Sequence, residues 1–351
     1  MRLRTALRRV VLRYNGRRRA MSKVMIRCFA RDNGPHNGFA LSEYHRLLNF
    51  QNMDRFKVHQ RVVDGATADV IIFVGPEFST FLDFRRSDEW RKYPEKCFIY
   101  YGGDRPLPLL PGVYTSLERR FYAPSWTRTA SYLRVAENAN INDLGSVDKC
   151  DLLYSFSGAG INHQVRRKIL GLQHTRGVVL DTSSLPVQER QRDAPTRPED
   201  KYVDSYLSLL MRSKFILCPR GVGTSSWRLF ETMKAGRVPV IISDQWVPPE
   251  GPSWLECSIR VPESEVMLIP ETLERREVDA RKLALAARKA WDDWFSSDVI
   301  FHRIVEWCLA IQADRSLPTK IQSLLYHVRL LRPHFFRYWL MADIKRYVLS
   351  R

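Results

Sequence analysis

The sequence of 351 residues lacks the signatures of several large protein classes. No apolar stretch approaches the ~20 residues that span a bilayer, and none forms the apolar centre of a signal peptide. A P-loop lysine, a complete Gly-x-Gly-x-x-Gly fingerprint and a Gly-x-Ser-x-Gly elbow are all absent. These absences leave a P-loop nucleotidase, a dinucleotide-dependent hydride carrier and a serine hydrolase of the elbow type without support.

Cysteine is also scarce, and the six that occur are widely spaced. No pair has the spacing of metal ligands, and several lie in apparent strands, so we expect buried, reduced thiols. An Asp-x-Asp pair, the usual site for a divalent cation beside a sugar diphosphate, does not occur. The sequence Trp291 to Trp294, WDDW, has helical surroundings and indicates surface acids beside core tryptophans.

Net positive charge is scarce outside the two ends of the chain. The formal net charge is +18, of which residues 1–23 contribute +9 and residues 315–351 contribute +7. The body, residues 24–314, therefore carries only +2. A body so near neutrality offers no broad phosphate-binding face, so we do not expect a nucleic-acid partner for it.

The two basic ends differ in their apolar content. Residues 1–22 form a basic extension: an amphipathic surface helix, a transit-like segment, or sequence upstream of a start at Met21. Residues 316–351 alternate basic residues with aromatics, which is the composition of an interfacial helix. A final helix packed on the body is an equally good interpretation of that end. We expect a cytoplasmic protein whose two basic ends favour an anionic membrane surface. Such a protein would bind peripherally to the inner face of the membrane.

Between these ends, strand patterns alternate with helix patterns. KVMIRCFA, ADVIIFV and KCFIYY are apolar runs of strand length in the first half, and LLYSFSG and GVVLD follow in the second. Such alternation predicts parallel sheets covered by helices on both faces. The polar stretch 136–149 separates the halves, so we expect an N-terminal domain over 23–145 and a C-terminal domain over 146–315.

The segment 213–244, SKFILCPRGVGTSSWRLFETMKAGRVPVIISD, contains a β-α-β unit. Two short apolar runs, at 214–218 and 238–242, flank a helix that begins after Thr224, Ser225 or Ser226 and ends before Gly236. The two strands should be parallel neighbours.

The turn that opens this helix has the chemistry of an anion site. Gly221 and Gly223 let the backbone approach a ligand, and the free N–H groups of a helix start favour an anion. Arg220 and Arg228 flank the turn, and guanidinium groups match phosphate oxygens. An ordinary turn with surface arginines is the alternative. A second glycine turn, Ser157 to Gly160, precedes a helix that carries Arg166, and two such turns at one sheet edge favour a nucleotide diphosphate.

The residues of this segment carry a family resemblance. The order Ser-Lys-Phe, Pro-Arg-Gly, Ser-x-Arg with a glutamate three residues later, and Gly-x-x-Pro-Val resembles the C-terminal half of exostosin-like glycosyltransferases, glycosyltransferase family 47. GGDRPLPLLPGVY, from Gly102, is similar to a motif of bacterial members of that family. The pattern occupies the following positions: Pro219, Arg220, Gly221, Ser226, Arg228, Glu231, Gly236, Pro239 and Val240.

The resemblance implies a GT-B enzyme, in which two Rossmann-like domains face each other across a cleft. It implies an inverting glycosyltransferase that takes a sugar from a nucleotide diphosphate, a UDP-sugar by our expectation, to a glycan or lipid-linked acceptor. Arginines and a helix start would stabilise the leaving diphosphate where a metal otherwise acts, so we expect no cofactor and no metal.

Roles for single residues follow from the resemblance. Arg220 and Arg228 are expected at the donor phosphates, with Gly221, Gly223 and Ser226 giving backbone access. Ser157, Gly158 and Arg166 complete the phosphate side, and Asp244 and Trp246 are expected beside the sugar. Glu231 lies one turn beyond Arg228, where it accepts from a ribose, orients Arg228, or forms a plain i,i+3 ion pair.

Inversion also requires a base that deprotonates the acceptor hydroxyl, and we expect it in the N-terminal half. Asp104, after the strand 97–101, is the first candidate, although it also suits as the partner of Arg105. Asp32 and His36, after the first strand, are rivals.

Two alternatives to this assignment stay open. Animal exostosins carry two arginines where this chain has Val222 and Gly223, so their donor is not transferred to it. A fucosyltransferase-like enzyme that uses a GDP-sugar shares the arginine-glycine and glutamate-helix pattern. The basic ends alone also suit a non-catalytic protein that binds nucleic acid or a membrane.

Overall fold

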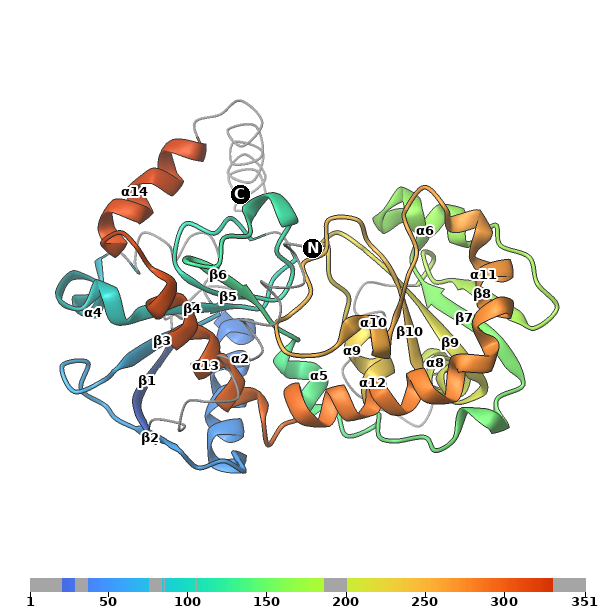
Figure 1. Cartoon of the computed structure of the whole chain (residues 1–351), viewed down its shortest axis with the longest axis horizontal. Helices are drawn as coiled ribbons and strands as arrows, with labels where there is room; N and C mark the ends of the chain where they lie inside the picture. Colours follow the sequence, from blue (N-terminus) through green and yellow to red (C-terminus); the bar gives the residue numbers. More distant parts are fainter. Residues whose placement is uncertain are drawn as a thin grey trace, which may run out of the picture.

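The computed structural model describes residues 21–28, 37–75, 84, 86–104, 106–185 and 201–330. Within them, two α/β domains lie side by side, each built on one parallel sheet (Figure 1). The predicted fold class, GT-B with two doubly wound domains, is confirmed. None of the helices in the described ranges is long and apolar enough to cross a membrane.

The N-terminal sheet has six strands in the order β2-β1-β3-β4-β5-β6, all parallel. Its centre is the fully buried run β3, whose continuous β-branched and aromatic side chains suit a strand covered on both faces. The three longest strands match the predicted runs, whereas β2, β5 and β6, of three residues each, were too short to recognise. The elements are β1 (Ser22–Cys28), α2 (Asn37–Met53), β2 (His59–Arg61), β3 (Val70–Val74), α4 (Asp88–Lys92), β4 (Cys97–Tyr101), β5 (Gly112–Tyr114), β6 (Thr127–Thr129) and α5 (Leu133–Glu137).

The C-terminal sheet has five strands in the order β11-β10-β9-β7-β8, again all parallel. The predicted β-α-β unit is present, with helix α9 between β9 and β10, and Gly236 ends α9 at φ 66° as a C′ glycine does. The elements are β7 (Leu152–Gly158), α6 (Gln164–Ile169), β8 (Gly177–Asp181), α8 (Lys201–Arg212), β9 (Ser213–Pro219), α9 (Trp227–Lys234), β10 (Val238–Ile242), α10 (Trp254–Cys257), β11 (Ile259–Arg260) and α11 (Ile269–Arg276).

Both sheets reverse their strand order at one point, between β1 and β3 in the first and between β7 and β9 in the second. Doubly wound sheets bind ligands beyond the carboxyl ends of the strands at such a switch point. In the second sheet this point carries the two glycine turns, because Gly158 ends β7 and Gly221 follows β9.

The chain returns to the N-terminal domain at its end. Helix α12 (Ala280–Trp294) packs on α9, whereas α13 (Ile300–Asp314) packs on α2 and on β5 of the N-terminal sheet. The predicted boundary at 315 is therefore wrong, since α13 belongs with the N-terminal domain. Last comes α14 (Thr319–Leu330). The spacing of apolar residues could not reveal that α13 packs on the N-terminal domain, because an apolar helix face does not specify which sheet it covers. Short 3₁₀ turns complete the fold: Pro94–Lys96, Arg119–Phe121, Val147–Lys149, Gly160–Asn162, Val266–Leu268 and Glu277–Asp279.

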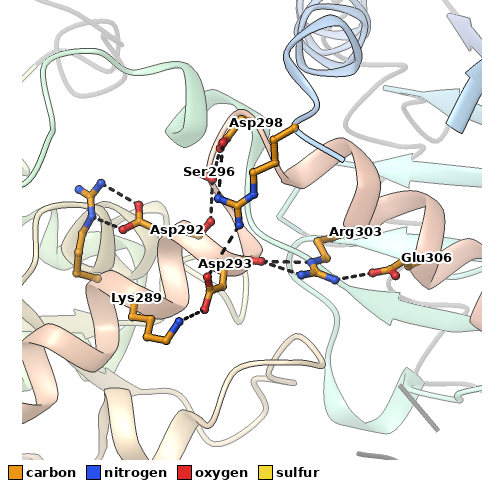
Figure 2. A network of polar contacts seen from close by, with 9 residues as sticks. Lys289, Asp292, Asp293, Ser296, Asp298, Arg303 and Glu306 are labelled. Carbon is orange, nitrogen blue, oxygen red and sulfur yellow. Dashed lines mark hydrogen bonds and ion pairs between the residues drawn. The ribbon is translucent and has the colours of Figure 1, made fainter. Parts of the chain in front are cut away.

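The elbow between α12 and α13 is fixed by polar contacts (Figure 2). Ser296 donates from Oγ to Asp298 Oδ1 at 2.6 Å, and Arg303 donates to the carbonyl of Asp293 at 3.1 Å and to Glu306 Oε2 at 2.6 Å. Beside them Asp292 and Asp293 form i,i+4 ion pairs with Arg288 and Lys289 while Trp291 is buried, which confirms the interpretation of WDDW.

The six cysteines are free, and five of them are buried. This confirms that they are thiols rather than half-cystines, with Cys28 as the partly exposed one. Burial raises the pKa of Cys218 to about 12, so this thiol stays protonated in the core.

Candidate active site at the domain interface

A cavity of about 270 Å³ lies where the two domains meet. Both domains line it, the N-terminal one through the loop after β4 and through α5, the C-terminal one through the glycine turn and α9. Seven predicted site residues lie in its wall: Asp104, Arg166, Gly221, Gly223, Ser226, Arg228 and Glu231.

Arg228 is held at the base of the C-terminal wall. It donates from Nη2 to the carbonyl of Ser157 at the end of β7. Its guanidinium carbon lies 5.0 Å from the ring centroid of Phe156 and 5.7 Å from that of Tyr206. A guanidinium clamped between two rings and a carbonyl has little rotamer freedom left, so it presents its charge to the cavity in a fixed place.

Arg166 lies on the same wall and reaches it from the neighbouring helix α6. Its Nε donates to the carbonyl of Arg220 at 2.9 Å, and the side chain is only 9% exposed. A Cβ on Gly221 would lie 2.9 Å from Nη2 of Arg166, so the glycine leaves room for this arginine. The absence of a side chain at Gly221 thus makes room for Arg166 as well as for any ligand.

Glu231 has a protein partner at the cavity edge. The hydroxyl of Tyr206 donates to Glu231 Oε2 at 2.7 Å. Burial, and then the negative charge of Glu231, raises the pKa of Tyr206 well above its usual value, so this hydroxyl remains a donor. The sequence analysis did not single out Tyr206, although its position fits the helical spacing of the apolar residues of α8.

Gly223 has a structural role in addition to the predicted one. A Cβ there would lie 2.2 Å from Ser116 Oγ and 2.5 Å from the carbonyl oxygen of Asp104. Ser225 N also donates to Ser116 Oγ at 3.0 Å, and Thr224 Oγ1 donates to the carbonyl of Leu117 at 3.1 Å. The glycine turn is therefore a contact between the domains, and Gly223 permits their close approach.

The opposite wall contains residues that the sequence did not indicate. Arg134 from α5 lies with its guanidinium carbon 3.8 Å from the ring centroid of Trp227, and Tyr132 meets the same ring edge-on at 5.9 Å. Burial raises the pKa of Tyr132. Asp104 is exposed at the cavity rim. Arg134 reaches the cavity because it lies on α5, the short helix after β6. A helix of five residues is too short to show helical periodicity in the sequence.

Five predicted residues lie outside the cavity lining. Ser157 and Gly158 lie behind Arg228, whose Nη2 would be 3.2 Å from a Cβ on Gly158. The Arg220 side chain instead points towards Glu263, with 3.9 Å between Nη1 and Oε1. These three residues support the wall rather than form it.

The two residues expected beside the sugar are also elsewhere. Trp246 is 2% exposed and meets Trp254 edge-on at 4.9 Å, so it is a core residue. Asp244 is exposed and exchanges backbone-to-carboxylate hydrogen bonds with Glu263, at 3.0 and 3.2 Å. Proximity in sequence to a strand end misled both predictions, because the chain turns away from the cavity after β10.

Two of the predicted candidates for the base, Asp32 and His36, lie outside the described residues, as does Arg105. Within the described ranges, no group of three or more His, Cys, Asp or Glu side chains has the arrangement of a metal site.

Comparison with known proteins places the similarity on a segment that runs from the last part of the N-terminal domain through the C-terminal sheet. Residues 119–276 match the Exostosin GT47 domain. The Exostosin-1 homolog of Caenorhabditis elegans is 35% identical over 158 residues, which cover 41% of this chain and 41% of that protein. A probable glucuronosyltransferase of Oryza sativa is 34% identical over 134 residues, 35% of this chain and 31% of that protein. The chain thus matches less than half the length of these relatives.

Among solved structures, a glycosyltransferase from Rickettsia africae superposes with a TM-score of 0.42 at 10% identity, over 85% of this chain and 100% of the other. The MurG protein of Acinetobacter baumannii superposes with a TM-score of 0.39 at 11% identity, over 82% and 99%.

The sequence relatives come from animals and plants, so the narrower prediction of a bacterial-type member has no support. The matched segment contains the glycine turn, α9 and β10. In sequence, residues 119–276 are therefore similar to the exostosin GT47 domain, as the motif predicted.

Proposed function

We propose that the protein is an inverting glycosyltransferase that moves a sugar from a nucleotide diphosphate to a hydroxyl of a glycan or lipid-linked acceptor. The observation that carries this proposal is the cavity at the switch point of the C-terminal sheet, which two arginines of the C-terminal domain and a carboxylate of the N-terminal domain line together. The similarity of residues 119–276 to the exostosin GT47 domain supports it.

The C-terminal wall suits the donor. Arg166 and Arg228 would bind the diphosphate, and α9, eight residues long, adds the partial positive charge of its start. As the bond between the sugar and the diphosphate breaks, negative charge grows on the leaving phosphate. Fixed guanidinium groups stabilise that charge without reorganising. Such preorganised electrostatic stabilisation of the transition state is usually the largest contribution to the rate enhancement.

The N-terminal wall suits the acceptor. Asp104, exposed at the rim, would accept the proton of the acceptor hydroxyl while its oxygen forms the new bond to the anomeric carbon. Attack from the face opposite the leaving group inverts the configuration. A positioned base of this kind contributes about 10²–10⁴ in rate.

The donor assignment is tested by the melting temperature of the protein with UDP, GDP, ADP or CMP in the absence of metal. A ligand that binds the folded state alone raises the melting temperature, by an amount that grows with its concentration over Kd. We expect UDP to give the largest shift. A shift with GDP alone points to the fucosyltransferase-like alternative, and no shift with any nucleotide contradicts the proposal.

The base is tested by Asp104→Asn. The amide keeps the size of the side chain but cannot take a proton, so turnover should fall by about 10²–10⁴ while nucleotide binding stays unchanged. Unchanged turnover would instead favour Asp32 or His36.

We further propose that no metal takes part, because guanidinium groups occupy the place where a cation would neutralise the diphosphate. Turnover should persist in EDTA. Loss of turnover on chelation, with recovery on adding Mn²⁺ or Mg²⁺, would show that this part of the proposal is wrong.

A further inference from the structure

Helix α14 has its polar and apolar faces inverted. Thr319 and Ser323 are fully buried against the N-terminal domain, and Tyr326 stacks on Trp126 with 5.0 Å between ring centroids. The opposite face is exposed and apolar, with side chains between 43% and 62% exposed. This face, which we call the α14 face, consists of Leu317, Ile321, Leu324, Leu325 and Val328.

The α14 face is continuous along the helix. Leu317 lies two residues before the helix, and the four members within it follow one another at intervals of three, one and three residues, which places these four on one side of a helix with 3.6 residues per turn. Scattered exposed leucines are ordinary on a protein surface, but a full apolar stripe opposite a polar, buried one is not. Such a stripe marks a surface that another body covers.

Basic side chains lie beside the α14 face. Lys320 of α14 and Arg91 and Lys92 of the neighbouring helix α4 are exposed, and Lys320 Nζ donates to the carbonyl of Arg91 at 3.4 Å, so the two helices are adjacent (Figure 1). The acids nearby have cationic partners. Asp88 lies 3.8 Å from Lys92 Nζ, Glu89 pairs with Arg27 at 3.1 Å, and Glu95 pairs with Arg315 at 3.2 Å. The surroundings of the face are thus suited to an anionic partner.

The sequence that follows the helix has the same chemistry. Residues 331–351, which lie outside the described ranges, contain five Lys or Arg, five aromatic residues and one acid. Phe335, Phe336, Tyr338 and Trp339 are four of five consecutive residues, with Arg332 before them and Arg337 between them. Aromatic residues interleaved with basic ones are the composition of segments that bind the interface of an anionic membrane.

We propose that the α14 face is a docking surface for an anionic lipid bilayer. Its apolar side chains enter the boundary between headgroups and acyl chains, and the flanking basic side chains lie at the headgroups, as in interfacial helices. In Figure 1, α14 lies at the end of the N-terminal domain that is remote from the C-terminal domain. Docking would bring the proposed acceptor-side domain to the membrane. The inference goes beyond the proposed transferase activity and does not depend on it.

The test is co-sedimentation of the full chain with vesicles of phosphatidylcholine alone or mixed with phosphatidylglycerol. The test variant carries Ile321→Ser, Leu324→Ser and Val328→Ser. The control variant carries three changes at still more exposed apolar side chains of the C-terminal domain, Leu255→Ser, Val278→Ser and Leu285→Ser. All six side chains are exposed, so both variants should fold.

We expect the unaltered chain to bind the mixed vesicles, and to bind less as salt rises. The test variant should lose at least about tenfold in partitioning, which corresponds to about 1.4 kcal/mol, while the control stays within about twofold of the unaltered chain.

Three results overturn the proposal. One is equal binding of the test variant and the unaltered chain. Another is that the unaltered chain binds no vesicle and sediments as a dimer, whereas the test variant sediments as a monomer and the control variant as a dimer. A second copy then covers the face. The third is a fall in melting temperature of the test variant with unchanged lipid binding, because the segment 331–351 then covers it.

Discussion

At the scale of single residues, the two arginines of the glycine turn are not equivalent. The motif suggested that Arg220 and Arg228 both contact the donor, but only Arg228 lines the cavity, while Arg220 points towards Glu263. The side chain that joins Arg228 there is Arg166, 54 residues before Arg220, which it contacts through the backbone carbonyl.

This difference gives a paired prediction. Arg228→Ala removes a charged hydrogen bond of about 1.5–3 kcal/mol to the diphosphate, so UDP affinity should fall about ten- to a hundredfold. Arg220→Ala leaves the carbonyl that holds Arg166 in place and should change affinity far less. Isothermal titration of both folded variants measures the contrast. Equal losses would return Arg220 to the donor site.

At the scale of secondary structure elements, the glycine turn between β9 and α9 joins the domains as well as lining the cavity. Gly223→Ala places a Cβ 2.2 Å from Ser116 Oγ and 2.5 Å from a backbone carbonyl, and a backbone atom cannot move aside cheaply. We expect a loss of about 1–3 kcal/mol of stability from this overpacking.

The matched control is Gly38→Ala in α2, where a Cβ would meet no atom within 4 Å. Because alanine is the better helix former, this change should stabilise by about 0.5–1 kcal/mol. Urea denaturation of both variants measures the difference. Equal stability of Gly223→Ala and the unaltered protein would mean that the domains separate more readily here than the structure indicates.

A second element-scale prediction concerns Glu277 in the turn after α11, which contacts Arg176 just before β8 and Lys214 of β9. It accepts from Arg176 at 2.7 and 2.8 Å and from Lys214 at 2.7 Å. Hydrogen bonds from Arg176, followed by those from Lys214, lower its pKa from 4.5 to about 2. Because the folded-state pKa is the lower one, this stabilisation is present above pH 4.5 and is lost as pH falls towards 2.

Glu277→Gln should therefore destabilise the protein by about 1–2 kcal/mol at pH 7, because the partners are partly exposed. The difference from the unaltered protein should shrink between pH 4.5 and pH 3 in urea titrations. Glu271→Gln is the control, since its ion pair with Arg275 spans 3.7 Å between exposed side chains. A difference that stays constant with pH would exclude the linkage.

At the scale of the whole molecule, α13 ties the end of the C-terminal domain to the N-terminal sheet. His302 of α13 stacks on His59 of β2, with 4.8 Å between ring centroids, and its Nε2 lies 3.2 Å from Glu306 Oε1. Burial, and then the neighbouring His302, lowers the pKa of His59 to about 4. The unfolded chain takes up this proton near pH 6.5, so stability is lost as pH falls from 6.5 towards 4.

His59→Phe keeps an aromatic ring at this junction but removes the titration. Relative to this variant, the unaltered protein should lose stability between pH 6.5 and pH 4, as measured by the midpoint of urea denaturation. Parallel pH profiles of the two proteins would show that His59 does not control this contact.

The sequence by itself determined the alternation of strands and helices, the β-α-β unit, the glycine turns and the neutral body. These follow from local rules, because periodicity, capping residues and glycine act over a few positions. It also led to seven residues of the cavity wall, since the carboxyl ends of neighbouring parallel strands must meet at one edge.

The tertiary structure alone decided what faces that edge. Arg134 and Tyr132 reach the cavity, Trp246 enters the core and α13 crosses to the other domain, because domain packing selects among local options of similar energy. The apolar face of α14 belongs here too. Its pattern is that of an ordinary amphipathic helix, and only packing revealed that the polar side is the buried one.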